Sequence, residues 1–413
     1  MAAAAPPLAP PFEWSRTTSA QRKTVIAAAL GWMLDSFDMM LYSLVVTELI
    51  RHFGLAKSTA GFLNSLTLVG SAIGSVVFGL AADRWGRRSM LCASILAYSV
   101  FTFACGMATS VPMLAAFRFL LGVGMGGEWN TGAALVAETW PSEWRGRAMA
   151  LVQSSWAIGY ALAAAVAGII LAHAGWRWVF FAGILPALIT LWIRRDVPEP
   201  ELWKRQALRP KQDTGPLWRA SLGPAAALLA TNTFGMFAWW GLFSWMPAYL
   251  ALPVSDGGRG FQLTGTTAFL VVLNLVGMFP GYLLFGYLAD RFGRKRSVIL
   301  YLASAAAMAV SFASAREPVG ILVFACLTAF FGTGFFVGCG IIAAEIFPTP
   351  IRSTALGVTY NVARGLSALA PLIIGRIGET NGLDAAFYAC GAAYAVAALS
   401  AFFVRETRGR ELE

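Results

Sequence analysis

The sequence predicts an all-α membrane protein: twelve transmembrane helices in two pseudo-symmetric six-helix bundles. Three observations carry this prediction. Apolar runs of about twenty residues, each long enough to cross a bilayer, recur along the whole chain. Only 13% of the 413 residues are charged, against roughly 25% in a soluble chain of this length. The second half of the chain also repeats the first at a constant spacing of 207 residues.

The apolar runs place six helices in each half of the chain. In the first half they cover residues 24–50, 58–82, 88–108, 112–137, 146–172 and 176–194. In the second half they cover residues 221–251, 264–289, 296–314, 319–345, 352–378 and 383–404. We therefore expect five parts: a disordered tail at 1–21, an N-terminal bundle at 22–194, a cytoplasmic linker rich in Arg, Lys and Pro at 195–220, a C-terminal bundle at 221–405, and a tail at 406–413.

The repeat holds at several separate anchors without gaps. The decapeptide 79–88 matches 286–295, and under the same spacing Glu138 falls on Glu345 and Trp32 on Trp239. Duplicated six-helix halves with a site between them are a typical plan of secondary transporters.

The net charge of +10 could suggest a nucleic-acid partner, but the placement of the basic residues argues against one. With loops assigned alternately to the two sides, 23 Lys and Arg lie on the side of the N-terminus and six on the other. This asymmetry follows the positive-inside rule and predicts that both termini are cytoplasmic. The basic composition then reflects topology and contact with anionic lipid.

Two acids interrupt the first apolar run. A charged Asp at mid-membrane depth costs about 3 kcal/mol on insertion scales, so Asp35 and Asp38 are expected to face a cavity and to act there. The only histidines, His52 and His173, fall in predicted external loops, so carboxylates must carry any proton. Burial favours the neutral form of a carboxyl group, which suits proton uptake and release. We expect Asp35 and Asp38 to share this role, unless they only partner a buried arginine.

Arg364 lies in the middle of the run 352–378, just after Tyr360 and Asn361. Its planar guanidinium matches a carboxylate with two parallel hydrogen bonds. The predicted helices of the second half contain no mid-membrane acid that would neutralise it. Arg364 therefore suits an anionic substrate; a permanent ion pair, or attraction to Asp35 and Asp38 across the cavity, is the alternative.

Other polar residues within the runs could bind the same substrate. Gln153 and Tyr360 correspond under the repeat, so they should face each other across the pseudo-two-fold axis. Some of these residues will only join helices, through hydrogen bonds worth under about 1 kcal/mol. The substrate-binding candidates are Arg364, Tyr360, Asn361, Gln153, Asn274 and Asn232. Trp156, Trp239 and Trp240 either wall the cavity or simply pack.

Several motifs resemble those of a known family. The decapeptides 79–88 and 286–295 resemble the signature loop of the major facilitator superfamily, and Arg118-Phe-Leu-Leu-Gly122 resembles its second motif. Within this superfamily, the segments 31–38 and 124–132 resemble those of metabolite:proton symporters, most closely the branch of sialate:proton symporters and lactate permeases. The superfamily resemblance covers residues 22–405.

The resemblance adds expectations for further residues. It implies that Arg118 works with the helix 1 acid and lies near Asp38 in one conformational state. Glu128 is a second proton site or a structural acid. It also implies that the signature loops control the inward gate. We expect Glu138 to pair with Arg145 and Glu345 with Arg352. The positive charges could also simply orient the protein in the membrane, and the two roles are compatible. The gating candidates are Asp83, Arg84, Arg87, Asp290, Arg291, Arg294, Glu138, Arg145, Glu345 and Arg352.

The segment 122–127 spells the glycine pattern of dinucleotide-binding proteins. No strand is predicted before it and it lies inside an apolar run, so we interpret it as close helix packing.

These features predict a transporter and not an enzyme, working by alternating access as a symporter of a proton and a small organic anion. The substrates we expect first are monocarboxylates such as lactate or pyruvate. The alternatives are sialic acid or an aromatic acid, or a proton-independent organic anion facilitator or exchanger. We expect no cofactor beyond the coupling proton, no metal and no nucleic acid. We expect the protein to be a monomer, surrounded by lipid in the bacterial cytoplasmic membrane.

Overall fold

The computed structural model describes residue 14 and residues 17–198 and 215–408. The predicted tails and linker therefore fall largely outside the described residues. Every regular element in the described part of the chain is helical. The all-α prediction is confirmed.

Six helical segments of the N-terminal half correspond to the six predicted spans. They are α1 (Ser19–Phe53), α2 (Lys57–Trp85), α3 (Arg87–Gly106), α4 (Val111–Thr139), α5 (Ser142–His173), and a sixth made of α6 (Trp176–Ala182), η2 (Leu185–Leu188) and α7 (Ile189–Asp196). The first helix begins earlier than expected because Thr18 caps it. The Thr18 side chain accepts from the Gln21 backbone, and the Gln21 side chain accepts from the Thr18 backbone.

The C-terminal half repeats this order. Its segments are α9 (Gly215–Ala251), then α10 (Leu263–Val272), η4 (Leu273–Met278) and α11 (Phe279–Phe292) as one span, α12 (Arg294–Ser314), α13 (Pro318–Ile346), α14 (Thr349–Ser367) with α15 (Ala370–Thr380), and α16 (Leu383–Ala401). The short η3 (Val254–Asp256) lies between α9 and α10. The helix α9 begins six residues before the predicted start of this bundle.

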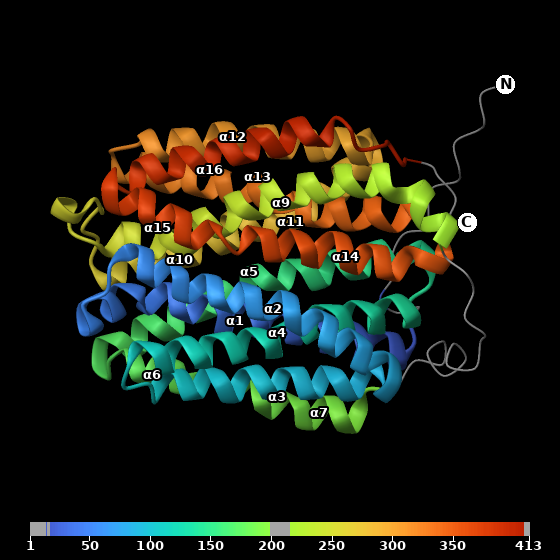
Figure 1. Cartoon of the computed structure of the whole chain (residues 1–413), viewed down its shortest axis with the longest axis horizontal. Helices are drawn as coiled ribbons and strands as arrows, with labels where there is room; N and C mark the ends of the chain where they lie inside the picture. The colour runs from blue at the N-terminus through green and yellow to red at the C-terminus, as the bar shows by residue number, and fades with distance from the viewer. Residues whose placement is uncertain (1–13, 15–16, 199–214, 409–413) are drawn as a thin grey trace.

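The two halves form two bundles that lie side by side (Figure 1). In the first bundle α1 packs against α4 and α5, and in the second α9 packs against α14 and α16. Across the interface α2 packs against α14 and α15, α5 against α10 and α11, and α1 against α9. The start of α1 and the end of the described chain after α16 lie at one end of the molecule (Figure 1). We call this the terminal end, and the opposite one the far end.

Nine helices of the described chain are long and apolar enough to cross a membrane. The other three predicted spans are interrupted or less apolar. Span 6 is interrupted between α6 and α7, span 7 is the tryptophan-rich α9, and span 11 carries Arg364 and breaks between α14 and α15, just before Pro371. Twelve helical spans in two bundles match the sequence prediction.

Small residues set the distance between α2 and α4. A Cβ on Gly74 would lie 2.0 Å from the Val123 carbonyl oxygen, and one on Gly122 would lie 2.1 Å from that of Thr67. A Cβ on Gly126 would lie 2.1 Å from the Ser71 carbonyl. The glycine pattern at 122–127 therefore serves helix packing, as expected.

Candidate functional site

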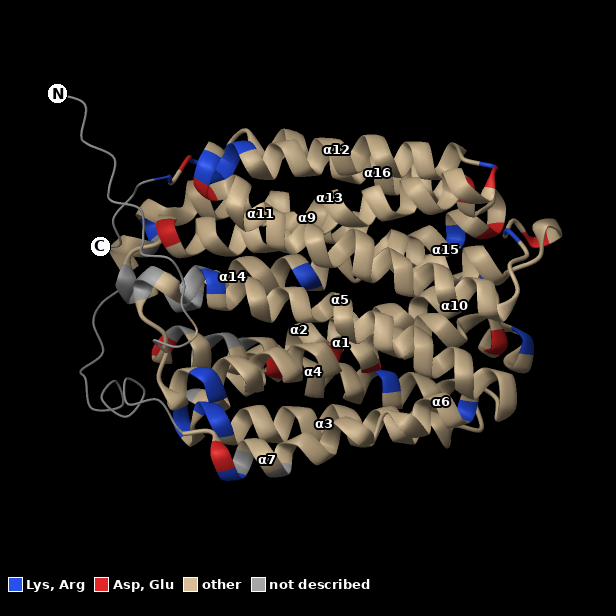
Figure 2. Cartoon of the chain, turned by 180° about the vertical axis from the view of Figure 1, so that it is seen from behind, with Lys and Arg blue, Asp and Glu red and all other residues tan. Residues whose placement is uncertain are grey.

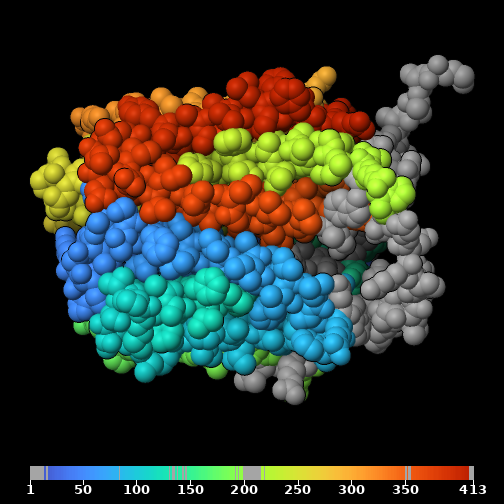
Figure 3. All heavy atoms as spheres, viewed as in Figure 1, coloured from blue at the N-terminus to red at the C-terminus, as the bar shows by residue number. Residues whose placement is uncertain are grey.

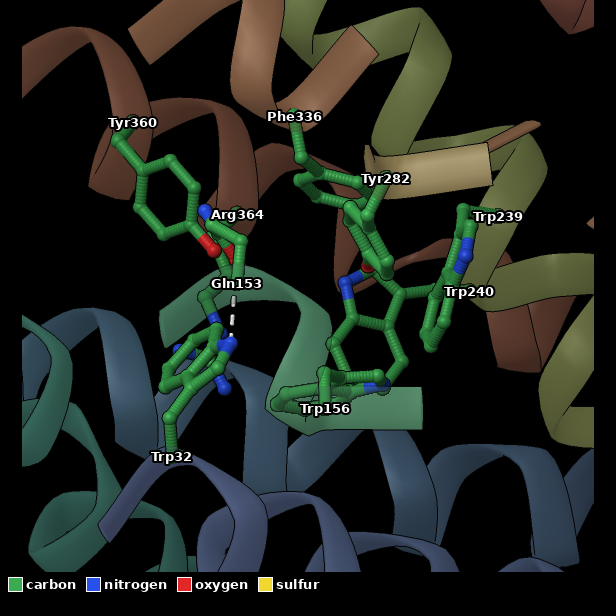
Figure 4. Close-up of a pocket in the computed structure, with 9 residues that line it drawn as sticks. All are labelled: Trp32, Gln153, Trp156, Trp239, Trp240, Tyr282, Phe336, Tyr360 and Arg364. Atoms are coloured by element: carbon green, nitrogen blue, oxygen red, sulfur yellow. Dashed lines mark hydrogen bonds between the residues drawn. The ribbon is translucent and has the colours of Figure 1, made fainter. Parts of the chain in front are cut away.

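A cavity lies between the two bundles, near the middle of the helices. Residues from both bundles line it, and seven of the nine lining side chains are aromatic. They are Trp32 from α1, Gln153 and Trp156 from α5, Trp239 and Trp240 from α9, Tyr282 from α11, Phe336 from α13, and Tyr360 and Arg364 from α14. Figure 4 shows these side chains converging from the two bundles. The cavity holds about 20 Å³, which is room for roughly one water molecule. A substrate can enter only if the aromatic side chains separate.

Arg364 is the only charged residue among the described residues that line this cavity. Its side chain is buried, and its guanidinium carbon lies 5.8 Å from the centroid of the Trp240 ring. The Nε and Nη2 atoms have no hydrogen-bond partner among the described residues. Because an arginine stays charged in proteins, this arrangement leaves a buried cation with unused donors.

The aromatic wall follows the internal repeat. Trp32 donates from Nε1 to the Gln153 side-chain oxygen at 3.1 Å (Figure 4), and its ring centroid lies 4.8 Å from that of Trp156. Trp239, the repeat partner of Trp32, has its ring centroid 4.7 Å from that of Trp240. Corresponding residues of the two halves thus face one cavity, as the repeat predicted for Gln153 and Tyr360.

Three predicted substrate-binding residues do not line the cavity. Asn274 is buried in η4, where its side-chain nitrogen donates to the Leu270 carbonyl at 2.8 Å. This bond within the same helix satisfies the amide donor and turns it from the cavity. Asn232 is buried on α9, and Asn361 is half-buried on α14 beside Tyr360. Position within an apolar run did not reveal which way these side chains point.

Three acids are buried in the N-terminal bundle close to the cavity. Asp35 is fully buried on α1, and neither of its carboxylate oxygens has a hydrogen-bond partner in the described structure. Arg364 interacts electrostatically with Asp35 and with Glu128, although no hydrogen bond joins Asp35 to it. The charge of Arg364 therefore acts on acids of the opposite bundle.

Asp38 is fully buried and turns away from the cavity, toward α3. Its Oδ2 accepts a hydrogen bond from the Thr102 hydroxyl at 3.0 Å, and its Oδ1 has no partner among the described residues. We expected both aspartates to face the central cavity, but neither Asp35 nor Asp38 is among the described residues that line it, and both are fully buried. The whole middle of α1 is enclosed by neighbouring helices, so two residues three apart meet different neighbours.

Glu128 of α4 reaches the backbone of α1. A Cβ on Gly31 would lie 2.4 Å from the Glu128 Oε1 atom, so a larger residue would push this carboxyl group aside. Glu128 is 1% exposed, and its Oε2 has no hydrogen-bond partner within the described chain. Because residue 31 is a glycine, the Glu128 side chain can lie directly against α1, the helix that carries Asp35.

Arg118 is fully buried but does not pair with Asp38 in this structure. Its Nη2 donates to the Asn64 side-chain oxygen at 2.8 Å, and its guanidinium lies 4.2 Å from the centroid of the Tyr42 ring. The expected approach to Asp38 is therefore not seen in this conformation, since Asn64 and Tyr42 hold the guanidinium instead.

Charged clusters repeat at the terminal end, where Figure 2 shows many Lys and Arg residues. Arg87 forms an ion pair with Glu138 at 3.3 Å in the first bundle. Its repeat counterpart Arg294 forms ion pairs with Glu345 at 3.3 Å and with Asp290 at 3.0 Å. The same interhelical pair therefore holds the terminal end of each bundle.

The remaining gating candidates take other positions. Arg84 lies over the Trp85 ring, with 5.8 Å between its guanidinium carbon and the centroid. Arg291 donates to the Tyr287 hydroxyl at 3.1 Å. The side chains of Asp83, Arg145 and Arg352 lie outside the described residues, and so do the pairs expected for Arg145 and Arg352.

At the far end, hydrogen bonds join the two bundles. The Lys57 ammonium, at the start of α2, donates to the Asp256 carbonyl at 2.7 Å and to the Gly378 carbonyl at 3.4 Å. The Ser58 backbone donates to the Glu379 carboxylate at 3.3 Å. We call these contacts the far-end latch. In the face that Figure 3 shows, the two bundles meet closely at the far end.

Some residues of this site were not singled out from the sequence. Tyr282 and Phe336 line the cavity, and Phe336 is the repeat counterpart of Trp129, whose ring lies 4.6 Å from that of Trp32. The repeat could therefore have indicated Phe336. Thr102 and Tyr98 lie one turn apart on α3, and this polar pair on an apolar helix was the available signal.

The family model described as Major Facilitator Superfamily matches residues 28–266 and 258–413.

Three curated transporters are similar along most of their length. A probable 4-methylmuconolactone transporter of Cupriavidus pinatubonensis is 34% identical, covering 97% of this chain and 95% of that protein. A niacin transporter of Acinetobacter baylyi is 29% identical, covering 93% and 94%. A sialic acid transporter of Escherichia coli is 28% identical, covering 89% and 90%. The expected resemblance was to a branch that holds sialate:proton symporters and lactate permeases. These names include a sialic acid transporter and do not support a relation to lactate permeases.

A solved structure shows the same fold. The proton:xylose symporter XylE superposes with a TM-score of 0.76 at 20% sequence identity, covering 95% of this chain and 98% of that one.

Proposed function

Because this chain belongs to the major facilitator superfamily, and is therefore a membrane transporter and not an enzyme, we propose that it is a proton-coupled symporter of small planar organic acids, aromatic or unsaturated. The substrate carboxylate binds Arg364, and its flat body lies among the tryptophans of the cavity. The proton binds within the group formed by Asp35, Asp38 and Glu128.

One observation carries this proposal: a buried arginine with unpartnered donors stands in a cavity whose other walls are almost entirely aromatic. A guanidinium binds a carboxylate with charge-assisted hydrogen bonds. Aromatic rings prefer offset or edge-to-face contact with other rings, worth about 0.5–1.5 kcal/mol per pair beyond the buried area. A planar acid uses both features, whereas lactate or pyruvate would leave the aromatic wall unused.

The names of similar transporters support the same substrate class. Niacin is a small aromatic acid, and a niacin transporter is among the relatives. The first choice from the sequence, a monocarboxylate such as lactate or pyruvate, has no such support. The alternative of an aromatic acid is therefore the one we adopt.

Coupling follows from the electrostatics of the site. Arg364 interacts with Asp35 and Glu128 across the bundle interface. When an anion neutralises Arg364, the acids lose a nearby positive charge, and protonation of one of them becomes easier. Anion and proton thus favour each other's binding, and the loaded carrier has no net added charge.

We place the protein in the bacterial cytoplasmic membrane as a monomer, with the terminal end on the cytoplasmic side. The ion pairs at that end form when the inward gate closes and break when it opens. The far-end latch then closes the external side.

Uptake by proteoliposomes tests the proposal. Purified protein is reconstituted, and uptake of nicotinate, benzoate, muconate, sialic acid, lactate and pyruvate is measured with and without an imposed inward pH gradient. We expect accumulation of the planar acids above equilibrium only with the gradient. Uptake of lactate in preference to every planar acid would contradict the substrate class. Equal uptake with and without the gradient would favour a proton-independent facilitator.

A further inference from the structure

One face of α3 carries hydroxyl groups toward the buried acids. Ser94, Tyr98 and Thr102 follow one another at intervals of four residues, so they share one face of the helix. The Ser94 hydroxyl donates to the Gly124 carbonyl at 2.7 Å, and the Thr102 hydroxyl donates to Asp38 at 3.0 Å. This face therefore contacts α4 at one level and α1 at the next.

Tyr98 stands between these two contacts. A Cβ on Gly124 would lie 2.7 Å from the Tyr98 backbone nitrogen, which places Tyr98 directly beside this position of α4. Helical side chains lean toward the N-terminus of their own helix. Since α3 and α4 run antiparallel, the Tyr98 ring leads from Gly124 toward Glu128, one turn further along α4.

The Tyr98 hydroxyl is buried without a bonding partner among the described residues. The side chain is fully buried, and its oxygen makes no hydrogen bond within the described chain. Glu128 from α4 and both Asp38 and Asp35 from α1 act electrostatically on it. If Tyr98 served packing alone, phenylalanine would fill the same space without burying a lone hydroxyl.

We propose that the Tyr98 hydroxyl relays protons between Asp38 and Glu128, so that the N-terminal bundle has a proton path separate from the substrate cavity. This inference rests on the proposed proton symport. It assigns to α3 a proton-carrying residue in a process that the sequence motifs place on α1 and α4.

The relay conserves protons and charge. The Tyr98 hydroxyl bonds to neither acid in this conformation, so the transfer takes place when it comes within hydrogen-bond distance of both. A protonated Asp38 carboxyl group then gives its proton to the Tyr98 oxygen while the Tyr98 hydroxyl proton passes to the Glu128 carboxylate. The old O–H bond of Tyr98 breaks as the new one forms, so the tyrosine is neutral before and after. One proton leaves Asp38 and one arrives at Glu128, while Thr102 stays bonded to the Asp38 carboxyl group.

Removing only the hydroxyl tests the relay. Tyr98→Phe keeps the ring, and Tyr301→Phe is the matched control because Tyr301 is a fully buried tyrosine on α12, the counterpart of α3. In proteoliposomes we expect Tyr98→Phe to lower uptake driven by a pH gradient at least tenfold and to change its pH profile. Substrate counterflow, which needs no net proton transfer, should stay within twofold of wild type. Tyr301→Phe should leave both measurements unchanged.

A second variant distinguishes the loss of the relay from a folding defect in Tyr98→Phe. Thr102→Val removes the hydroxyl that holds Asp38 and should produce the same selective loss of driven uptake. The relay is overturned if Tyr98→Phe keeps driven uptake and its pH profile, or if both variants lose counterflow in parallel with driven uptake. If the wild type itself shows no uptake driven by a pH gradient, the proposed function fails and the relay with it.

Discussion

Arg364 combines a permanent charge with donors that have no partner. Its planar fork matches a carboxylate, whereas a lysine ammonium would offer a single point charge at a different reach. Charge-assisted hydrogen bonds are worth about 1.5–3 kcal/mol. The arginine should therefore contribute mainly to substrate affinity.

We expect Arg364→Gln to weaken substrate binding by about tenfold or more, because 1.4 kcal/mol corresponds to a factor of ten. Arg364→Lys should restore only part of the loss. The quenching of tryptophan fluorescence on titration with nicotinate measures the dissociation constant, since several tryptophans line the cavity. Arg376→Gln, at an exposed position of α15, is the control. Unchanged affinity in Arg364→Gln would show that Arg364 does not bind the substrate carboxylate.

Gly31 tests the position of Glu128 from the opposite helix. A methyl group there would lie 2.4 Å from the Glu128 carboxylate and would push this carboxyl group aside. We expect Gly31→Ala to lower proton-driven uptake by about tenfold. Gly265→Ala, where an added Cβ meets nothing within 4 Å, should keep the wild-type rate. Equal rates in the two variants would show that Glu128 tolerates displacement.

At the scale of elements, packing of α2 on α4 holds the first bundle. Gly74 lies where an added Cβ would meet the Val123 carbonyl oxygen at 2.0 Å. Such contact forces the helices apart, and membrane helices rely on close packing for their association.

We expect Gly74→Ala to lower the apparent unfolding temperature in detergent by several degrees. Gly286→Ala on α11, which meets no atom within 4 Å, should leave the unfolding temperature unchanged. A thermal scan of both purified variants, followed by intrinsic fluorescence, measures the difference. Identical unfolding temperatures would mean that the helices adjust without loss of stability.

The sequence indicated elements better than it indicated directions of side chains. Apolar runs and the repeat predicted twelve spans, and the repeat placed Gln153 and Tyr360 at the cavity. The face of Asp38 was missed because residues three apart on a helix are about 60° apart around its axis, and neighbouring helices decide which contact each makes. Tyr282 was missed because it follows the π-helix η4 and Pro280, which change the local helical register.

The whole molecule is closed at its far end in this structure. Lys57 and Ser58 of the first bundle bond to Asp256, Gly378 and Glu379 of the second. In alternating access, these bonds must break before the far end can open. The far-end latch should therefore bias the balance between the two states.

We expect Lys57→Met to shift this balance toward a far end that is open. Spin labels at Thr109→Cys and Glu317→Cys, exposed positions of the two bundles near the far end, report the separation in a background without native cysteines. Electron–electron distance measurements should show a larger population of long distances in Lys57→Met. Arg51→Met, whose ion pair with Glu48 stays within α1, should match the parent protein. No change in Lys57→Met would mean that apolar packing alone closes this end.

The central claim is that an anion on Arg364 and a proton on the buried acids cross the membrane together. The most direct measurement records substrate uptake and internal pH at once in proteoliposomes that contain a trapped pH indicator. The account predicts that wild-type protein acidifies the lumen as nicotinate enters, while Asp35→Asn keeps counterflow and neither accumulates substrate nor moves protons. Substrate accumulation by wild-type protein without acidification, or an Asp35→Asn variant that still couples the two, would contradict it.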